Sequence, residues 1–290
     1  MTAIQALLDG LIDYAGLFPP AGIDMVTAVR NYASYRSGEY VWALGRFIVP
    51  AERLTEFSAA FTDACCDEQM TPWLLSVLST GDLLKDERLI SDFSEGAVFI
   101  DVLECKAENS AKAESMFTVM PQEITVYVEF PLEQCKEMLP VLKRANALAK
   151  IRTGGISVGA FPDIEQLAHF LVSCAEAKVP FKATAGMHHP LRSVYKLTYE
   201  TESASTLMHG FINVFVAATI AYYGAKKEDV LAVLSEQDSA AFQWSSHALT
   251  WRGRKLSAKQ IREARENFAT GFGSCSFTEP IDDLQALGWL

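Results

Sequence analysis

Two lysines, each followed by glycine, are the residues in this sequence best suited to chemistry on a carbonyl group. Lys150 lies in the run Ala-Lys-Ile-Arg-Thr-Gly-Gly (149–155), and Lys182 lies in Pro-Phe-Lys-Ala-Thr-Ala-Gly (180–186). A lysine becomes a nucleophile when its pKa falls, and a second nearby cation lowers that pKa. If the two lysines lie on adjacent strands, one can form an imine with a carbonyl compound while the other tunes it.

The elements that would position these lysines alternate between apolar runs and helical segments. Strand-like runs occur at 43–49, 72–78, 97–103, 124–130, 148–152 and 180–185, with helical segments near 51–64, 81–93, 107–119, 132–147 and 164–177. Near-continuous apolar strands with helices between them indicate a parallel sheet covered on both faces. Further strands are expected at 240–246 and 272–277, which brings the count to eight.

The expected fold is therefore an α/β chain forming a single-domain (β/α)8 barrel of the TIM type. Residues 1–40 carry helical periodicity and a double proline but no evident strand, so they are expected to form a helical cap on a barrel that occupies 41–290. Within this cap, Asp13 and Tyr14 either reach into the site or belong to a packed turn. Such a barrel places its active site at the carboxyl ends of its strands.

Strand parity predicts which side chains face the barrel interior, because alternate residues of a strand face opposite sides. The predicted interior set combines four cations with two carboxylates and is completed by polar residues: Arg46, Lys150, Arg152 and Lys182; Asp101 and Glu129; Thr184, Gln243, Ser274 and Ser276. An excess of cations favours an anionic small molecule as ligand. Asp101 or Glu129 could transfer protons during imine chemistry. The alternative is a structural cluster of ion pairs that ties the strands together.

The segments Lys150-Ile-Arg-Thr-Gly-Gly and Lys182-Ala-Thr-Ala-Gly locally resemble class I aldolases of the deoxyribose-phosphate aldolase kind. In that family a Lys-Thr-x-Thr-Gly strand carries the Schiff-base lysine, and a following Lys-x-x-Gly-Gly strand carries the lysine that tunes it. The resemblance implies Lys150 as the Schiff-base residue, Lys182 as its partner and Asp101 as a candidate acid. By the count above the two lysines lie on strands five and six, whereas the family uses six and seven, and Met187 replaces the family's second glycine. Which lysine forms the imine therefore stays open.

Two adjacent histidines follow the strand of Lys182. His188 or His189 could bind a divalent metal with Glu129 or Asp101, act as a general base or the substrate's hydrogen-bonding partner, or simply occupy a loop. No HxH or HExxH spacing occurs in the chain, and we assign no metal ligands and no cofactor.

The segment Thr270 to Pro280 carries glycine and hydroxyl groups near the eighth predicted strand. Gly273, Ser274 and Ser276 could cradle a phosphate or carboxylate, as backbone N–H groups at this position often do in barrels, or could form a tight turn. Cys275 alternates with the two serines, so we expect it to face the helices.

Composition limits the class of partner. A net charge of −11 and a pI near 5.0 argue against nucleic acid or an anionic membrane as partner. The six cysteines show no CxxC pairing and no basic signal segment precedes them, which favours a cytoplasmic protein with reduced thiols. The longest apolar run, 211–223, is shorter than the roughly 20 residues of a spanning helix. A homo-oligomer is possible, although no interface is evident.

Three functions are compatible with these features. The first is a carbon–carbon lyase that acts through a lysine on a small anionic carbonyl compound. The second is a metal-dependent hydrolase or isomerase that uses His188 or His189 with Glu129 and Asp101. The third is a non-catalytic binder of a small carboxylate or sugar phosphate.

Overall fold

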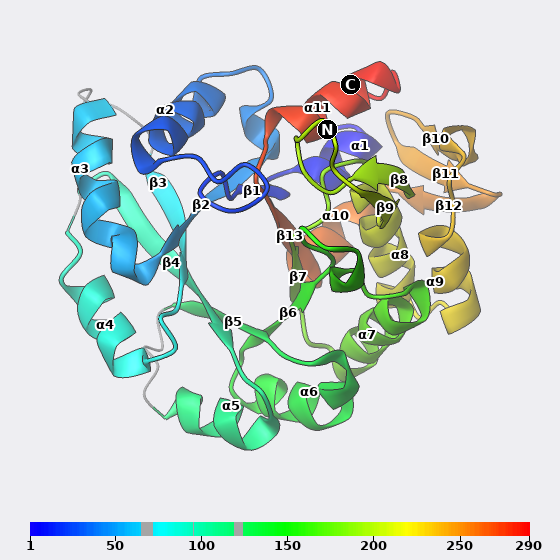
Figure 1. Ribbon diagram of the computed structural model, residues 1–290. Coiled ribbons are helices and arrows are strands. Elements are labelled where there is room, and N and C mark those ends of the chain that lie inside the picture. The colour runs from blue at the N-terminus through cyan, green and yellow to red at the C-terminus, as the bar shows by residue number, and fades with distance from the viewer. Residues whose placement is uncertain (65–71, 95, 119–123) are drawn as a thin grey trace.

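Eight parallel strands close into a barrel in the order β1-β13-β7-β6-β5-β4-β3-β2. The structure is a computed structural model and describes residues 1–64, 72–94, 96–118 and 124–290. The barrel strands are β1 (Ile12–Tyr14), β2 (Leu44–Pro50), β3 (Trp73–Leu78), β4 (Val98–Lys106), β5 (Thr125–Glu129), β6 (Leu148–Arg152), β7 (Phe181–Thr184) and β13 (Ala269–Ser274). Helices surround the strands on the outside (Figure 1). The chain is thus a (β/α)8 barrel of the TIM type, as the alternation of apolar runs and helices predicted.

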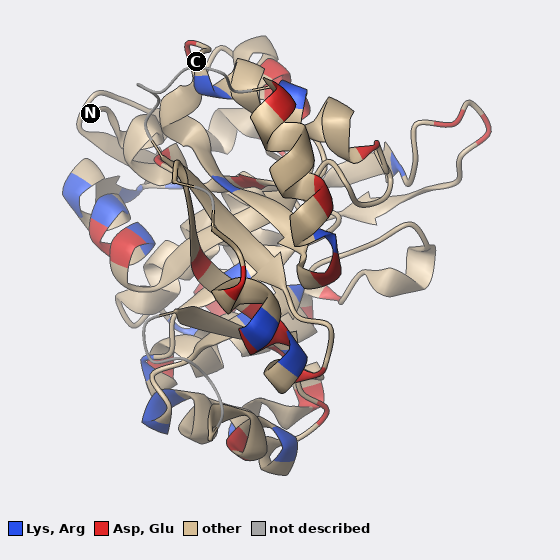
Figure 2. Ribbon diagram, turned by 90° about the vertical axis from the view of Figure 1, so that its left-hand side faces the viewer, with Lys and Arg blue, Asp and Glu red and all other residues tan. Residues whose placement is uncertain are grey.

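The α-helices precede the first barrel strand, lie between the strands and follow the last one. They are α1 (Ala3–Leu8), α2 (Met25–Arg36), α3 (Leu54–Ala64), α4 (Leu83–Ser91), α5 (Ser110–Phe117), α6 (Cys135–Arg144), α7 (Ile164–Ala177), α8 (Phe211–Tyr222), α9 (Lys227–Leu234), α10 (Ala258–Asn267) and α11 (Thr278–Ala286). In Figure 2 most charged residues lie on these outer helices and on loops, whereas the strands between them carry few. The large apolar side chains Phe47, Trp73, Phe181 and Phe272 are fully buried. Burial of such side chains is the main force that holds helices against strands.

Local signals explain where α7 begins and ends. Asp163 accepts a hydrogen bond from the backbone of Gln166, whose side chain in turn accepts one from the backbone of Asp163, which forms a capping box. The helix ends at Ala177, and the next residue, Lys178, adopts the left-handed conformation with φ of 55°. This defined length sets the path of the chain between the two lysine-bearing strands β6 and β7.

The last crossover, from β7 to β13, is much longer than the others. It contains the hairpin β8 (Ser193–Lys196) and β9 (Ser205–Met208), helices α8 and α9, and a separate antiparallel sheet of β10 (Phe242–Trp244), β11 (Ala248–Trp251) and β12 (Arg254–Ser257). Every residue of α8 from Phe211 to Ala221 is buried, and the two polar side chains among them, Asn213 and Thr219, donate hydrogen bonds to backbone carbonyls. Among the described residues, no helix has the length and apolar character needed to cross a membrane.

Two strand predictions are wrong, and together they change the strand count. The first forty residues contain β1, which pairs with β2 and β13 and closes the barrel. Its three residues are too short for a periodic pattern, and pairing on both edges stabilises it. The run 240–246 forms β10 outside the barrel, because it pairs with β11 instead of a barrel strand. The lysines therefore lie on the sixth and seventh barrel strands, not on the fifth and sixth.

Candidate functional site

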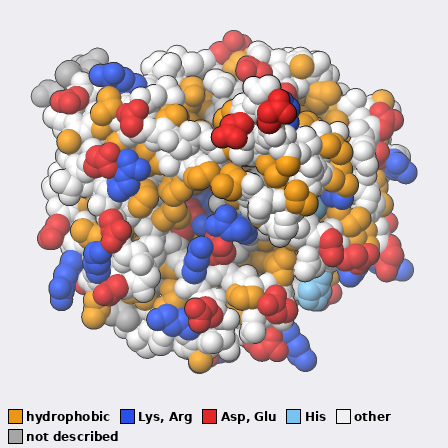
Figure 3. Space-filling model, viewed as in Figure 1, with side chains coloured by type: hydrophobic (Ala, Val, Ile, Leu, Met, Phe, Trp, Pro, Cys, Tyr) orange, Lys and Arg blue, Asp and Glu red, His pale blue; other side chains and the backbone are white. Residues whose placement is uncertain are grey.

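A cavity of about 240 Å³ opens at the carboxyl ends of the barrel strands. Figure 3 shows this face, where basic and acidic side chains meet near the centre and hydrophobic side chains border them. The wall is formed by the segments that follow β1, β6, β7 and β13 and by strand residues: Ala15, Phe18, Pro19, Ile48, Leu78, Glu104, Lys150, Arg152, Gly155, Ile156, Thr184, Ala185, His188, Gly273 and Cys275. Its size is below the usual range for drug-sized ligands, so it suits a small molecule.

Lys182 lies beneath this cavity and is held by two carboxylates. Its Nζ is 2.5 Å from Asp13 Oδ2 and 2.6 Å from Glu104 Oε1, and the side chain is 2% exposed. Burial by itself lowers the pKa of Lys182, but the charges of Asp13 and Glu104 outweigh it, so that the pKa is raised. The Lys182 ammonium therefore remains charged, and its side chain does not line the cavity.

Lys150 lies closer to the opening and does line the cavity. Its Nζ is 2.6 Å from Glu104 Oε2 and 3.3 Å from Glu129 Oε2. Glu104 thus bridges the two lysines, and Ser76 Oγ donates a further hydrogen bond of 2.5 Å to Glu104 Oε1. Burial raises the pKa of Glu104, but the charges of Lys150 and Lys182 lower it more, so that the carboxyl group is held ionised.

Glu129 connects this buried group to the rim. Arg152 Nε donates to Glu129 Oε1 at 3.1 Å, and Lys106 Nζ lies 3.7 Å from the same oxygen. Burial raises the pKa of Glu129, and the neighbouring Lys150, Arg152 and Lys106 lower it by more. The Arg152 side chain is 45% exposed, so it can turn toward a ligand at modest cost.

The glycines after the two lysine strands allow their loops to touch. A Cβ atom on Gly154 would lie 2.8 Å from Gly186 Cα, and one on Gly186 would lie 2.6 Å from Gly154 Cα. Thr153 Oγ1 donates a hydrogen bond of 2.6 Å to Ala185 O, which joins the same two loops. Gly186 also adopts a φ of 73°, which favours glycine. This contact fixes β6 and β7, and hence Lys150 and Lys182, relative to each other.

Arg46 and Asp101 face the interior as parity predicts, but at the opposite end of the barrel. Arg46 Nε and Nη2 donate to the two oxygens of Asp101 at 2.8 and 2.6 Å. Arg46 borders a separate pocket lined by Thr125, Leu148 and Thr270, which lie at the starts of their strands. Asp101 is therefore not at the lysine cavity, and the prediction that these two residues belong to that site is wrong. Parity fixes the face of a strand but not the height along it.

The two histidines point in different directions. His188 lines the cavity, with Nδ1 at 3.4 Å from Ser274 Oγ and 3.6 Å from Glu279 Oε2, and burial lowers its pKa to about 4. His189 instead contacts Asp283 Oδ2 at 2.6 Å and stacks on Tyr195. The predicted metal set of a histidine with Glu129 and Asp101 is not assembled, because Asp101 lies at the other end. Within the described parts of the chain, no group of three or more His, Cys, Asp or Glu side chains is arranged to hold a metal ion.

The end of the eighth strand differs in detail from the predicted cradle. Gly273 lines the cavity, whereas Ser274 is buried beside His188 and Ser276 Oγ accepts a hydrogen bond from the backbone of Glu279. Cys275 lines the cavity instead of facing the helices, because β13 ends at Ser274 and strand alternation stops there. Burial raises the pKa of Cys275, which keeps it as a thiol.

Of the other predicted residues, Thr184 lies in the cavity wall and Gln243 does not. Gln243 is exposed on β10, where it pairs with Thr250 outside the barrel, so the predicted interior position is wrong. The prediction failed because the strand that contains Gln243 belongs to a sheet outside the barrel.

Of the two carboxylates that hold Lys182, sequence reasoning missed Glu104 and left Asp13 open between a site residue and a packed turn. Asp13 lies on the unrecognised strand β1, and Glu104 lies just beyond the predicted end of the run 97–103. A register shift in β4 between Ile100 and Val102 also changes which residues face inward after it. With Asp13 and Glu104 counted, the interior set has four carboxylates and four cations, so the expected excess of positive charge is absent.

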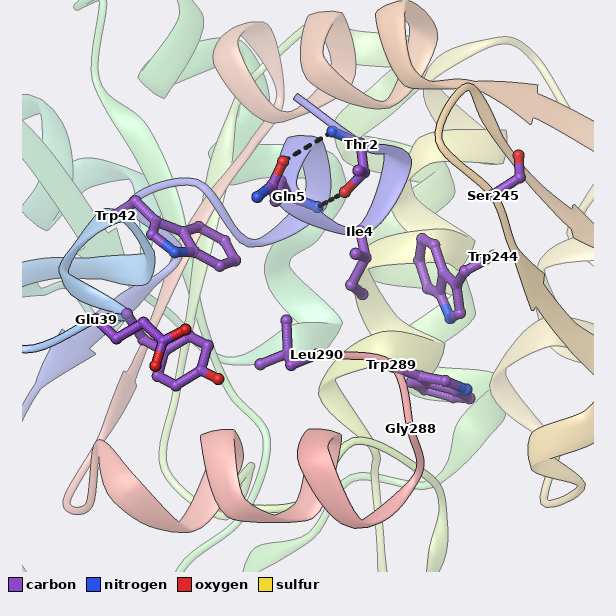
Figure 4. A pocket seen from close by; sticks show the side chains of 11 residues that line it. Thr2, Ile4, Gln5, Glu39, Trp42, Trp244, Ser245, Gly288, Trp289 and Leu290 are labelled. Carbon is purple, nitrogen blue, oxygen red and sulfur yellow. Dashed lines mark hydrogen bonds between the residues drawn. The ribbon is translucent and has the colours of Figure 1, made fainter.

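A second, more open cavity of about 440 Å³ lies beside α1 and α11, away from the lysines. Trp42, Trp244 and Trp289 surround it, and Thr2 and Gln5 exchange hydrogen bonds at its edge (Figure 4). Its only acidic or basic side chain is Glu39. The smaller lysine cavity contains more charged side chains, namely Glu104, Lys150 and Arg152, and is therefore the better candidate for a reactive site.

Comparisons with known proteins identify no family. No protein-family model matches the chain, and no curated protein matches it. Solved structures of mandelate oxidase align with it: one with 3,3-difluoro-2-hydroxy-3-phenylpropionic acid at 12% identity and a TM-score of 0.28, covering 99% of this chain and 69% of that one. A substituted form of mandelate oxidase with benzoyl-formic acid gives 12% identity and a TM-score of 0.28, covering 93% and 69%. Scores this low add nothing to the barrel topology already described.

Proposed function

We propose that this protein is a carbon–carbon lyase that forms an imine between Lys150 and a small carbonyl compound. One observation carries the proposal: the Lys150 amine lies in the wall of the cavity, while Glu104 couples it to a second, buried lysine. Charged groups are costly to bury, and a simple ion pair would need only one lysine and one carboxylate. A cluster of two lysines and three carboxylates at the carboxyl ends of barrel strands fits a catalytic role.

Imine formation first requires a neutral amine. Glu129 Oε2, 3.3 Å from Lys150 Nζ, is placed to accept the ammonium proton. The amine then attacks the carbonyl carbon, a C–N bond forms, and the carbonyl oxygen leaves as water after taking up two protons. Lys182 stays protonated beneath, held by Asp13 and Glu104.

The resulting iminium ion accepts the electron pair of the bond between its α carbon and a β carbon that bears a hydroxyl group. That bond breaks, a second carbonyl compound leaves as its hydroxyl loses a proton, and an enamine remains on Lys150. His188 lines the same cavity and is neutral above pH 4, so it is a suitable acceptor for the hydroxyl proton. Protonation of the enamine carbon and hydrolysis of the imine by water then restore the lysine.

The local resemblance to deoxyribose-phosphate aldolases supports this assignment. Lys150 and Lys182 lie on the sixth and seventh strands, the strands that the family uses for its Schiff-base lysine and its partner. The carboxylate beside both lysines is Glu104, not the Asp101 that the resemblance suggested. Lys150 is accordingly the proposed nucleophile and Lys182 the residue that tunes it.

Borohydride trapping tests the proposal. The protein is incubated with small aldehydes and 2-oxo acids, reduced, and analysed by intact and peptide mass spectrometry. We expect one adduct, on Lys150, which is lost in Lys150→Arg because arginine keeps the charge but forms no imine. Lys255→Arg, an exposed substitution on β12, serves as the matched control and should trap normally.

Two other outcomes of the trapping experiment would contradict the proposal. An adduct on Lys182 would overturn the choice of nucleophile. Absence of any adduct, together with thermal stabilisation by a carboxylate or sugar phosphate that persists in Lys150→Arg, would show a binding protein and not a lyase.

A further inference from the structure

One side of the lysine cavity is apolar. Phe18 and Pro19 enter from the segment after β1, and Ile48 and Leu78 from strands β2 and β3. Ile156, in the loop after β6, also lines the cavity although 55% of it is exposed. A ligand that covers an exposed apolar side chain removes apolar surface from water, which favours binding. This wall therefore favours a substrate with an apolar group and disfavours a chain of hydroxyl groups.

On the charged side of the cavity, the basic side chains Lys150 and Arg152 lie close together. Arg152 follows Lys150 by two residues on β6, so both side chains lie on the same face of the strand, about 7 Å apart at their Cα atoms. A carbonyl carbon bound to Lys150 would thus have an adjacent carboxylate within reach of the Arg152 guanidinium. Arginine binds carboxylates through two parallel N–H groups.

The loop after the eighth strand is poorly suited to phosphate. In many barrels this loop holds phosphate through backbone N–H groups. Here Ser276 Oγ already accepts from the backbone N–H of Glu279, and the Glu279 carboxylate lies 3.6 Å from His188 Nδ1 and accepts a hydrogen bond from Tyr199 at 3.2 Å. A second carboxylate, Asp283, lies on the same helix next to His189. Negative charge at this place repels a phosphate group.

We infer that the substrate is an unphosphorylated 4-hydroxy-2-oxo acid whose short side chain is otherwise apolar, with its carboxylate paired with Arg152 and its side chain packed against Phe18 and Ile156. The inference rests on the proposed imine chemistry of Lys150 and names the substrate class of that same site. The 240 Å³ cavity limits the side chain to a few carbon atoms.

Reductive trapping at graded probe concentrations tests the inference. The probes are 2-oxopentanoate, pentanal and glyceraldehyde 3-phosphate, and the readout is the concentration that gives half-maximal adduct on Lys150. Each value is divided by that of the same probe with Nα-acetyl-lysine, which removes differences in intrinsic reactivity. We expect 2-oxopentanoate to be favoured at least tenfold over each of the other two.

Matched variants test each side of the cavity. Ile156→Asn should raise the half-maximal concentration of 2-oxopentanoate several-fold, whereas Val158→Asn should not, since Val158 is equally exposed on the same loop but does not line the cavity. Arg152→Gln should remove the advantage of 2-oxopentanoate over pentanal.

The possible results separate the two proposals. Adduct formation that is equal for all probes, or best with glyceraldehyde 3-phosphate, would overturn the substrate class and leave the lyase proposal standing. No adduct with any probe would overturn the lyase proposal itself.

Discussion

The two ends of the barrel interior hold charged groups in different ways. At the amino end, Arg46 and Asp101 form a two-point pair in which donors and acceptors match one to one. At the carboxyl end, Glu104 is shared between two lysines, and Lys150 is shared between two carboxylates. In the first arrangement each charged group has one charged partner. In the second, a lysine or carboxylate that turns to a ligand still keeps another charged partner.

Burial follows the same division. The Arg46 and Asp101 side chains are 31% and 36% exposed, and water therefore screens their attraction. Lys150 and Glu104 are 5% and 1% exposed, so their interaction is strong and the loss of one partner is costly. In this barrel the buried, shared charges lie at the lysine cavity, whereas the partly exposed pair lies away from it.

The largest effect is expected from Glu104→Gln. Removal of this carboxylate leaves Lys182 with one anionic partner and weakens the hold on Lys150, which should destabilise the fold by about 3–5 kcal/mol. Trapping on Lys150 should fall by about 10²-fold, because the carboxylate that fixes the position of the Lys150 amine is gone. Urea unfolding and the trapping rate measure the two effects, and Glu176→Gln on the outer face of α7 is the control. A variant with normal stability and trapping would remove the distinction between the two ends.

The same substitution has a pH signature. The folded-state pKa of Glu104 is lowered, so its stabilisation is complete above the ordinary value of about 4.3 and is lost as the pH falls below it. The folded-state pKa of Lys182 is raised, so its contribution is present below about pH 10.4 and is lost at higher pH. Glu104→Gln should therefore flatten the acid side of the stability curve.

A smaller effect is expected from His188→Gln. Burial lowers the pKa of His188 from 6.5 to about 4, so the folded protein excludes a proton that the unfolded chain binds. The wild-type protein should lose roughly 2 kcal/mol of stability as the pH falls from 6.5 to 4, and the variant should lose less. Unfolding at a series of pH values measures this, with the exposed His169→Gln as control. Identical curves for wild type and variant would show that His188 titrates normally.

The smallest effect is expected at the amino end. Arg46→Gln and Asp101→Asn should each cost about 1 kcal/mol of folding stability, since the pair is partly exposed. Trapping on Lys150 should stay within twofold of wild type, because neither side chain lines the lysine cavity. A tenfold loss of trapping in either variant, with stability intact, would mean that the two ends are coupled through the barrel.

Long apolar runs were sufficient to predict most strands from sequence. The predicted runs at 43–49, 72–78 and 148–152 match β2, β3 and β6 within one residue at each end. The three-residue β1 was missed, because so short a strand is stabilised by its neighbours on both sides and carries no pattern of its own. The run 240–246 was misassigned, because an apolar run does not reveal which sheet it joins.

The sequence alone determined the fold class and the two lysines with their glycines, because apolar periodicity and the steric demands of glycine are local properties. Only the tertiary structure decided which charges meet. Asp13, Glu104 and Lys182 come from three distant segments, and their contact depends on closure of the barrel and on the shift in β4. The same closure places Asp101 beside Arg46, at the amino end of the barrel. Height along a strand depends on register across the whole sheet, and no local pattern encodes it.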